Sequence, residues 1–158
     1  MTYRFQSEVQ PVVPLRLKVE INTREHFTHM GLKDMAFEVV NPWFNGKASM
    51  RTYHLEELMG TKLRALYQRK KGRDLFDLWL ALTSTEVDPD MMVQCFHRYM
   101  EFGGTPVNRS TLETNLRLKV EDSLFNRDVL PLLTDEARVL YEAASPFDVI
   151  LDRLLPLV

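Results

Sequence analysis

A lysine in the middle of the chain falls on the apolar face of a predicted helix. Four apolar residues recur there at three- and four-residue spacing: Leu58, Met59, Leu63 and Leu66. Lys62 falls among them, whereas Glu57 falls on the opposite side, which we expect to face solvent. Because an unpaired buried ammonium group costs several kcal/mol, Lys62 must either extend to water or meet an anion. A phosphate is one such anion, and Arg69 lies on the same edge of the helix and could bind it too.

The next predicted helix carries the opposite charge. Asp74 and Asp77 are three residues apart, so they share one edge of a helix that is apolar at its other positions after Arg73. Two explanations need no ligand: Asp74 favours the positive end of its helix, and Asp77 pairs with Lys62 or an arginine. The other explanation is chemical. Carboxylates that face a lysine could take a proton from a hydroxyl group while a phosphate is held.

The segment that links these helices is strongly basic. It contains six basic residues and no acidic residue: Lys62, Arg64, Arg69, Lys70, Lys71 and Arg73. The whole chain has 20 Lys and Arg against 22 Asp and Glu, which excludes a globally basic nucleic-acid coat protein. The basic run is explained either by a solvated helix end that complements the helix dipole or by contact with phosphates of a nucleotide or an RNA.

Glu20 is the third candidate for a functional carboxylate. Residues 15 to 22 alternate between apolar and polar types, which predicts a strand with one buried face. Glu20 falls on the polar side of this strand, between Lys18 and Asn22. Most polar strand faces are merely solvated, so the position of Glu20 alone is a weak signal.

The remaining pattern predicts an α+β fold, in which a small antiparallel or mixed sheet precedes a helical bundle. Further strands are expected at residues 35–40 and 49–54. Helices are expected at residues 55–71, 73–82, 89–102, 110–124, 135–144 and 147–155. Ser110 with Glu113, and Thr134, are the expected helix caps. We expect residues 1–54 to form the sheet portion and residues 55–158 the helical portion, packed together as one unit.

The composition is that of an ordinary globular protein. The chain has 158 residues, of which 45% are hydrophobic, enough for one domain with a real core. Its single cysteine, Cys95, cannot form an intrachain disulfide. No stretch has the pattern of a signal peptide or a membrane span. We therefore expect a cytoplasmic protein without membrane contact.

Three segments, in this order, resemble successive motifs of the AbiEii/AbiGii-type nucleotidyltransferase toxins. They are the strand segment 17–22, the segment 58–69 with its Lys-Leu-x-Ala-Leu-x-x-Arg pattern, and the segment 72–78 with Arg-Asp-x-x-Asp-Leu. The two helical patterns, close together, are the specific part of the resemblance. It covers residues 15 to 85 by motif, and the later helices only by their general character.

The resemblance implies a nucleotidyltransferase of the DNA-polymerase-β-like type, which transfers a nucleotidyl group from an NTP to an acceptor hydroxyl with Mg²⁺. It also implies a toxin of phage-defence and toxin–antitoxin systems, with an antitoxin partner and in some members the acceptor end of tRNA as target. By position, Glu20 would be the strand carboxylate and a metal ligand, Lys62 the phosphate-binding lysine and Asp74 the acidic residue of the last motif. Three residues would support them: Asp77, Arg69 and Arg73.

The first motif of the family has no counterpart before Glu20. That motif is a Gly-Gly or Gly-Ser turn followed by an Asp-x-Asp/Glu pair, and the 19 residues before Glu20 do not contain it. We therefore expect a truncated family member with little activity alone. A sheet edge left open should favour a homodimer. The alternative is a non-catalytic RNA- or protein-binding module that uses the basic run from Lys62 to Arg73.

Overall fold

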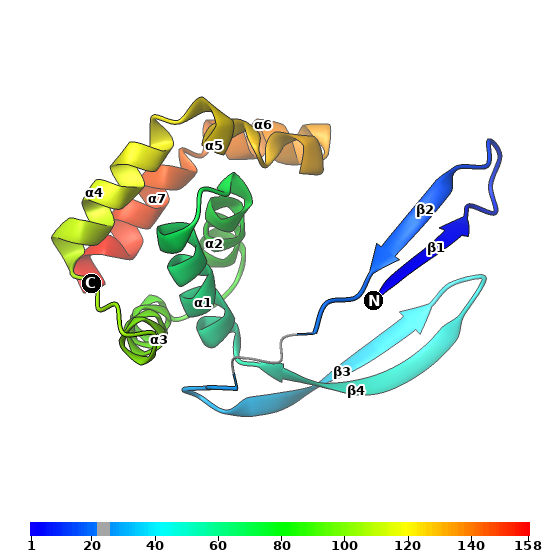
Figure 1. Cartoon of the computed structure of the whole chain (residues 1–158), viewed down its shortest axis with the longest axis horizontal. Coiled ribbons are helices and arrows are strands. Elements are labelled where there is room, and N and C mark those ends of the chain that lie inside the picture. Colours follow the sequence, from blue (N-terminus) through cyan, green and yellow to red (C-terminus); the bar gives the residue numbers. More distant parts are fainter. Residues whose placement is uncertain (22–25) are drawn as a thin grey trace.

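The first part of the chain forms two separate β-ribbons. The computed structural model describes residues 1–21 and 26–158. Its strands are β1 (Thr2–Gln6), β2 (Pro14–Lys18), β3 (Leu32–Val40) and β4 (Asn45–Tyr53). β1 pairs with β2 and β3 with β4, both antiparallel, and each pair is its own two-stranded sheet. Figure 1 shows both ribbons as an arm that extends away from the helices.

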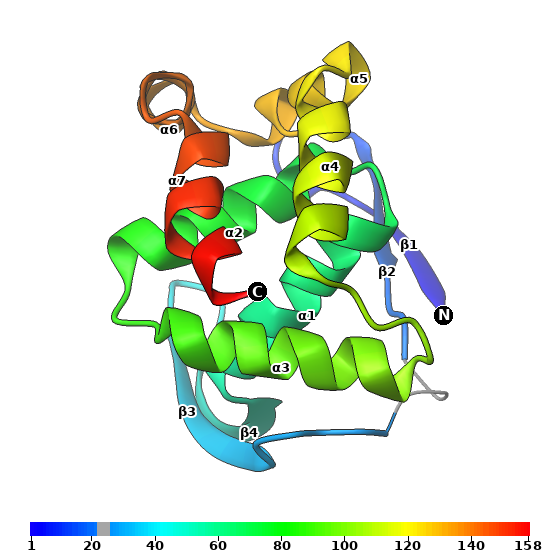
Figure 2. The same ribbon diagram turned by 90° about the vertical axis from the view of Figure 1, so that its left-hand side faces the viewer.

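The rest of the chain is helical. Its helices are α1 (Leu55–Gln68), α2 (Gly72–Ser84), α3 (Pro89–Phe102), α4 (Arg109–Val120), α5 (Ser123–Arg127), α6 (Asp135–Ala143) and α7 (Pro146–Arg153). Two 3₁₀ turns follow α5 and α7, at Leu130–Leu132 and Leu155–Leu157. α1 packs on α2 and α3, and α2 also packs on α7. Figure 2 shows α3 crossing below α1.

The hydrophobic core lies entirely within this helical part. Its fully buried side chains include Leu63 and Leu66 of α1, Leu78 of α2, and Met92 and Phe96 of α3. None of the residues before Glu57 that the structure describes is buried. The ribbons therefore contribute nothing to the core.

The predicted α+β class, with strands first and helices after them, is confirmed. The strands differ in detail because they form two ribbons, and β1 was not expected. β2 ends at Lys18, so Glu20 lies beyond the strand, and Asn22 lies outside the described residues. The alternating residues Leu15 and Leu17 were expected to face a core, but both are exposed. Alternation shows which side chains share a face, and burial depends on what covers that face.

The expected helix ends are partly right. The Thr134 hydroxyl accepts a hydrogen bond from the backbone N–H of Ala137 and caps α6, as expected. The cap of α4 is Asn108 rather than Ser110, since the Asn108 side chain accepts from the N–H of Thr111. The expected helix at residues 110–124 is interrupted, because Asp122 caps a separate helix, α5.

None of the helices in the described part of the chain has the length and apolar character needed to cross a membrane.

Gly60 allows α1 to approach α3 closely. A Cβ atom at this position would lie 2.6 Å from the Cβ of Cys95 and 2.8 Å from the carbonyl oxygen of Met92. Since the backbone of α3 cannot yield locally, we expect Gly60→Val to lower the free energy of unfolding by about 2 kcal/mol. Urea denaturation measures this change. The control is Gln68→Val at the exposed end of α1, and equal losses for both variants would contradict the close approach.

Candidate functional site

Four charged side chains meet between α1 and α2, and we call them the α1–α2 charge cluster: Lys62, Arg69, Asp74 and Asp77. The Nζ atom of Lys62 lies 2.6 Å from Oδ2 of Asp77 and 3.5 Å from Oδ1 of Asp74. The Nε and Nη2 atoms of Arg69 each donate to one oxygen of Asp74 at 2.7 Å. The sequence-based expectation that Lys62, Asp74 and Asp77 converge is therefore correct in geometry. The observed pairing of Lys62 with Asp77 also agrees with the simpler explanation for Asp77, which needs no bound ligand.

Asp74 is the most buried member of the cluster. Its side chain is 0% exposed, whereas that of Lys62 is 34% and that of Arg69 50% exposed. Hydrogen bonding to Asp74 raises the pKa of the Arg69 guanidinium, so this group stays charged. One buried carboxylate thus holds two cations whose outer parts reach solvent.

The turn between the helices explains this arrangement. Arg69 follows the last residue of α1 and has an extended backbone, and Asp74 lies in the first turn of α2. The backbone N–H of Asp74 donates to the carbonyl of Lys71 at 3.0 Å. A side chain at Gly72 would collide with the carbonyl oxygen of Phe125. Glycine therefore lets the start of α2 lie against α5. In this position, Asp74 lies within hydrogen-bond distance of Arg69.

Most of the basic run is neutralised within the chain. Lys70 pairs with Asp122 at 3.2 Å, and Lys71 pairs with Asp128 at 3.5 Å. The guanidinium of Arg64 lies 4.9 Å from the centroid of the Tyr99 ring. Arg73 is exposed and makes no ion pair with any residue that the structure describes. The run is therefore not a continuous free cationic surface.

Glu20 lies apart from the charge cluster. Its side chain is 75% exposed, and its carboxylate pairs with Lys18. Its described contacts include no member of the cluster. The resemblance implied that Glu20 belongs to the same site as Lys62 and Asp74. The contacts that the structure describes for Glu20 do not include either residue.

Lys119 is a buried lysine that sequence reasoning missed. Its Nζ atom donates to the carbonyl oxygens of Leu66 and Tyr67, at the end of α1. Burial, together with the charge of Lys70, lowers the pKa of Lys119 to about 8. Lys119 follows Leu112 and Leu116 at helical spacing, the same signal that singled out Lys62. Lys119 thus holds the end of α1, from which Arg69 leaves.

Glu57 is a buried carboxylate, although the helical pattern placed it on the solvent side. It accepts hydrogen bonds from the backbone N–H groups of His29 at 2.6 Å and Met30 at 3.0 Å. It also accepts from the hydroxyl groups of Thr28 at 3.0 Å and Tyr99 at 2.8 Å. The sequence-based placement of Glu57 is wrong because the segment before β3 covers this side of α1.

The residues of the charge cluster do not fit a Mg²⁺ ion in this arrangement. Both carboxylate oxygens of Asp74 are engaged by Arg69, and Asp77 is engaged by Lys62. Within residues 1–21 and 26–158, no group of three acidic, histidine or cysteine side chains is placed to hold a metal ion.

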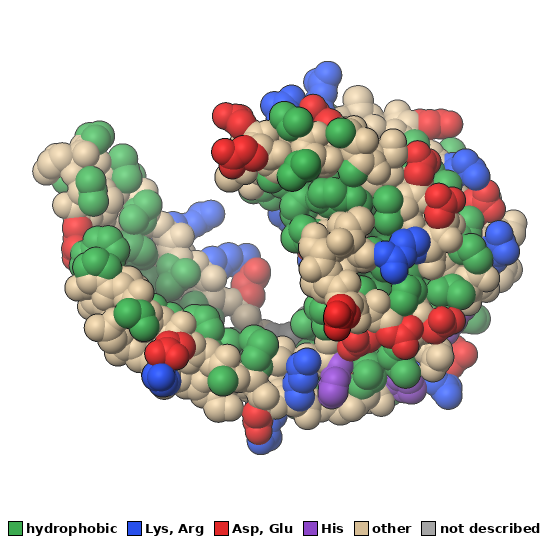
Figure 3. All heavy atoms as spheres, turned by 180° about the vertical axis from the view of Figure 1, so that it is seen from behind, with side chains coloured by type: hydrophobic (Ala, Val, Ile, Leu, Met, Phe, Trp, Pro, Cys, Tyr) green, Lys and Arg blue, Asp and Glu red, His purple; other side chains and the backbone are tan. Residues whose placement is uncertain are grey.

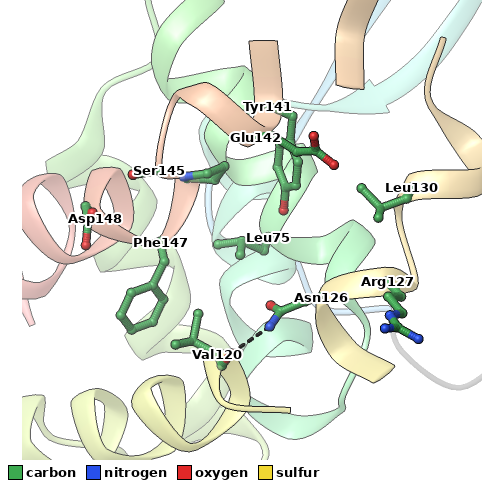
Figure 4. Close-up of a pocket in the computed structure, with 11 residues that line it drawn as sticks. Leu75, Val120, Asn126, Arg127, Leu130, Tyr141, Glu142, Ser145, Phe147 and Asp148 are labelled. Carbon is green, nitrogen blue, oxygen red and sulfur yellow. Dashed lines mark hydrogen bonds between the residues drawn. The ribbon is translucent and has the colours of Figure 1, made fainter. Parts of the chain in front are cut away.

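A pocket of about 490 Å³ lies among α2, α5 and the turn between α6 and α7 (Figure 4). Its wall includes the apolar residues Leu75, Leu130 and Phe147, and its polar residues include Arg127 and Glu142. The pocket contains no member of the charge cluster. It is therefore distinct from the candidate site.

Comparison with known proteins decides the family. The model of the family described as nucleotidyl transferase AbiEii toxin, type IV toxin–antitoxin system, matches residues 1–153. The chain belongs to the AbiEii family. The resemblance carried by the motifs around Lys62 and Asp74 is thus confirmed, and the match includes both ribbons. Neither the curated proteins nor the solved structures contain a match to this chain.

Proposed function

We propose that this AbiEii chain takes part in nucleotidyl transfer, and that its charge cluster binds the phosphates of an NTP. The observation that carries the proposal is the pair of cations, Lys62 and Arg69, fixed by the buried carboxylate of Asp74 and still accessible from solvent. Charge-assisted hydrogen bonds from such fixed cations bind phosphate oxygens well. The family description, a nucleotidyl transferase toxin of a type IV system, supports an NTP substrate and an antitoxin partner.

The contacts within the cluster suggest different roles for its two aspartates. Because Arg69 occupies both oxygens of Asp74, Asp74 acts as a positioning residue. Asp77 is partly exposed, and Lys62 is its one ion-pair partner among the residues that the structure describes. A phosphate that binds Lys62 releases Asp77, which can then accept the proton of an acceptor hydroxyl. Arg73, exposed at the start of α2, adds a further phosphate contact, and a role for Glu20 as a metal ligand stays a prediction.

Lys62→Ala tests the phosphate contact. We expect the affinity for a fluorescent ATP analogue to fall about 10- to 100-fold, the usual cost of a lost charged hydrogen bond. Fluorescence titration measures the affinity. The matched control is Lys33→Ala, which removes an exposed lysine of β3 and should leave binding unchanged. Equal affinities of Lys62→Ala and the unmodified chain would rule out the proposed contact.

Transfer itself is tested with labelled NTPs, Mg²⁺ and total tRNA as the acceptor. We expect little incorporation by this chain alone, because the cluster offers no pair of free carboxylates for a metal ion. Addition of a polypeptide that carries the Gly-Gly and Asp-x-Asp/Glu elements should raise incorporation. In that mixture, Lys62→Ala and Asp74→Ala should both abolish it.

The same variants separate the alternative, a non-catalytic RNA-binding module. In such a module, Lys62→Ala weakens RNA binding in a salt-dependent way, whereas Asp74→Ala leaves it unchanged or stronger. Parallel titrations with tRNA at two salt concentrations distinguish the two functions.

A further inference from the structure

The two β-ribbons are amphipathic, and their apolar faces are uncovered. In the β3–β4 ribbon, Met35 lies opposite Met50 and Phe37 opposite Ala48 on one face. In the β1–β2 ribbon, Tyr3 lies opposite Leu17 and Phe5 opposite Leu15. The large side chains of both sets are exposed: Tyr3, Phe5, Leu15, Leu17, Met35, Phe37 and Met50. Figure 3 shows hydrophobic side chains spread along the arm.

The opposite face of the β3–β4 ribbon carries charged side chains that are suited to contact with solvent. Asp34 pairs there with Arg51 at 3.4 Å, and Glu38 pairs with Lys47 at 3.0 Å. Both are cross-strand pairs on the side away from Phe37. The ribbon therefore has one solvent face and one face that is suited to packing.

A ribbon of two strands is marginally stable in water unless its apolar face packs against another surface. Here the helices of the same chain do not provide that surface, because no described residue before Glu57 is buried. Among the residues that the structure describes, 25 large hydrophobic side chains are exposed, of which 17 precede residue 54 and eight follow it. The excess of exposed apolar surface is thus concentrated on the arm.

The whole chain also exposes more surface, polar and apolar together, than a compact monomer of its mass. A compact monomer of this mass is expected to expose about 8,200 Å². The chain exposes 11055 Å², which is about 2,800 Å² more. A standard protein interface buries about 800 Å² on each partner, and permanent homodimers bury more. The excess is larger than one partner's share of a standard interface, and the exposed apolar side chains that a second copy could cover are concentrated on the arm.

We propose that the apolar faces of the two ribbons, centred on Phe37 and Met50, form the interface of a homodimer. A two-fold axis places the same patch on both copies, so a second chain supplies an apolar face of matching extent. Lys33, paired with Thr52 at the end of the patch, is the one charged side chain among the β3 and β4 positions on this face. A single cation at the edge of an apolar face disfavours a nucleic acid as the occupant. In the dimer, the ribbons pack face to face, as two sheets do in a sandwich.

The mass of the purified full chain in solution tests the proposal. Sedimentation equilibrium from about 1 to about 100 µM should give twice the chain mass of 18.5 kDa. We expect Phe37→Asp to raise the dimer dissociation constant about 30-fold or more, because each interface then buries two unpaired carboxylates. Ser49→Asp is the matched control, since Ser49 lies on the solvent face of the same ribbon. A chain that stays monomeric throughout, or equal effects of the two variants, overturns the proposal.

Hydrogen exchange gives a second measurement that needs no variant. Amides of β3 and β4 in the unmodified chain should exchange more slowly at the higher concentration, because docking stabilises a marginal ribbon. Exchange rates that do not depend on concentration contradict the dimer. If the ribbons are protected only after another polypeptide is added, that polypeptide is the occupant and the homodimer is wrong.

Discussion

Glu57→Ala should lower the free energy of unfolding by about 3 to 5 kcal/mol, because it leaves several buried hydrogen-bond donors without their acceptor. The carboxylate is fully buried and accepts four hydrogen bonds, from Thr28, His29, Met30 and Tyr99. Without it, two backbone N–H groups lose their acceptor, and the buried Tyr99 hydroxyl keeps only the carbonyl oxygen of Phe27, at 3.1 Å, among its described acceptors. The segment before β3 also loses its described anchor on α1.

Urea denaturation measures this loss. The neighbouring variant Glu56→Ala provides the control, because Glu56 lies in the same helical turn and makes no ion pair with a described residue. We expect Glu56→Ala to cost less than about 1 kcal/mol. Similar losses for the two variants would show that helix charge, and not the buried network, is responsible.

The pKa of Glu57 gives the same network a pH dependence. Burial alone would raise this pKa, but hydrogen bonds from the His29 N–H, the Tyr99 hydroxyl and the Met30 N–H lower it below 4.5 overall. A carboxyl group with a lowered pKa in the folded state stabilises the protein above pH 4.5, and this stability is lost as pH falls through the folded pKa. The stability gap between the unmodified chain and Glu57→Gln should therefore shrink in acid. A gap that is equal at pH 7 and pH 3 would contradict this assignment.

The sequence was informative where the interacting residues are close in the chain. Lys62 lies on α1, Arg69 directly follows this helix, and Asp74 and Asp77 lie on the next helix after a short turn. Helical spacing places the two aspartates on one edge of α2, and the short connection keeps that edge near Lys62. The convergence of Lys62, Asp74 and Asp77 could therefore be predicted without a structure, whereas the pairing of Arg69 with Asp74 depends on the extended backbone of Arg69.

The sequence was uninformative where the partners are distant in the chain. The pattern of α1 assigned Glu57 to solvent, because the backbone donors that cover it come from 28 and 27 residues earlier. The alternation of Leu15 and Leu17 defined a face correctly but could not show that no helix covers it. The hydrophobic pattern of a helix or strand shows which side chains share a face. Which face is buried depends on how the other elements pack against it.

Arg69→Ala should also lower the free energy of unfolding, by about 3 kcal/mol. This value is the lower end of the range for breaking a buried ion pair, and we expect the lower end because Arg69 itself is half-exposed. The variant leaves the buried carboxylate of Asp74 with one weak contact, Lys62 at 3.5 Å. Its negative charge would then lack the hydrogen bonds that compensate for lost hydration. Lys62→Ala should cost less, since Arg69 still occupies both oxygens of Asp74.

A matched surface pair isolates the effect of burial. Arg117 donates to Glu113 through Nε at 2.9 Å and Nη2 at 2.7 Å, but both side chains reach solvent on α4. Arg117→Ala should therefore cost less than about 1 kcal/mol. A double-mutant cycle of Arg69→Ala and Asp74→Ala, measured by urea denaturation, should give a coupling energy above about 2 kcal/mol. If the Arg69–Asp74 coupling is no larger than that of the Arg117–Glu113 pair, Asp74 does not act as the buried anchor that holds the two cations in place.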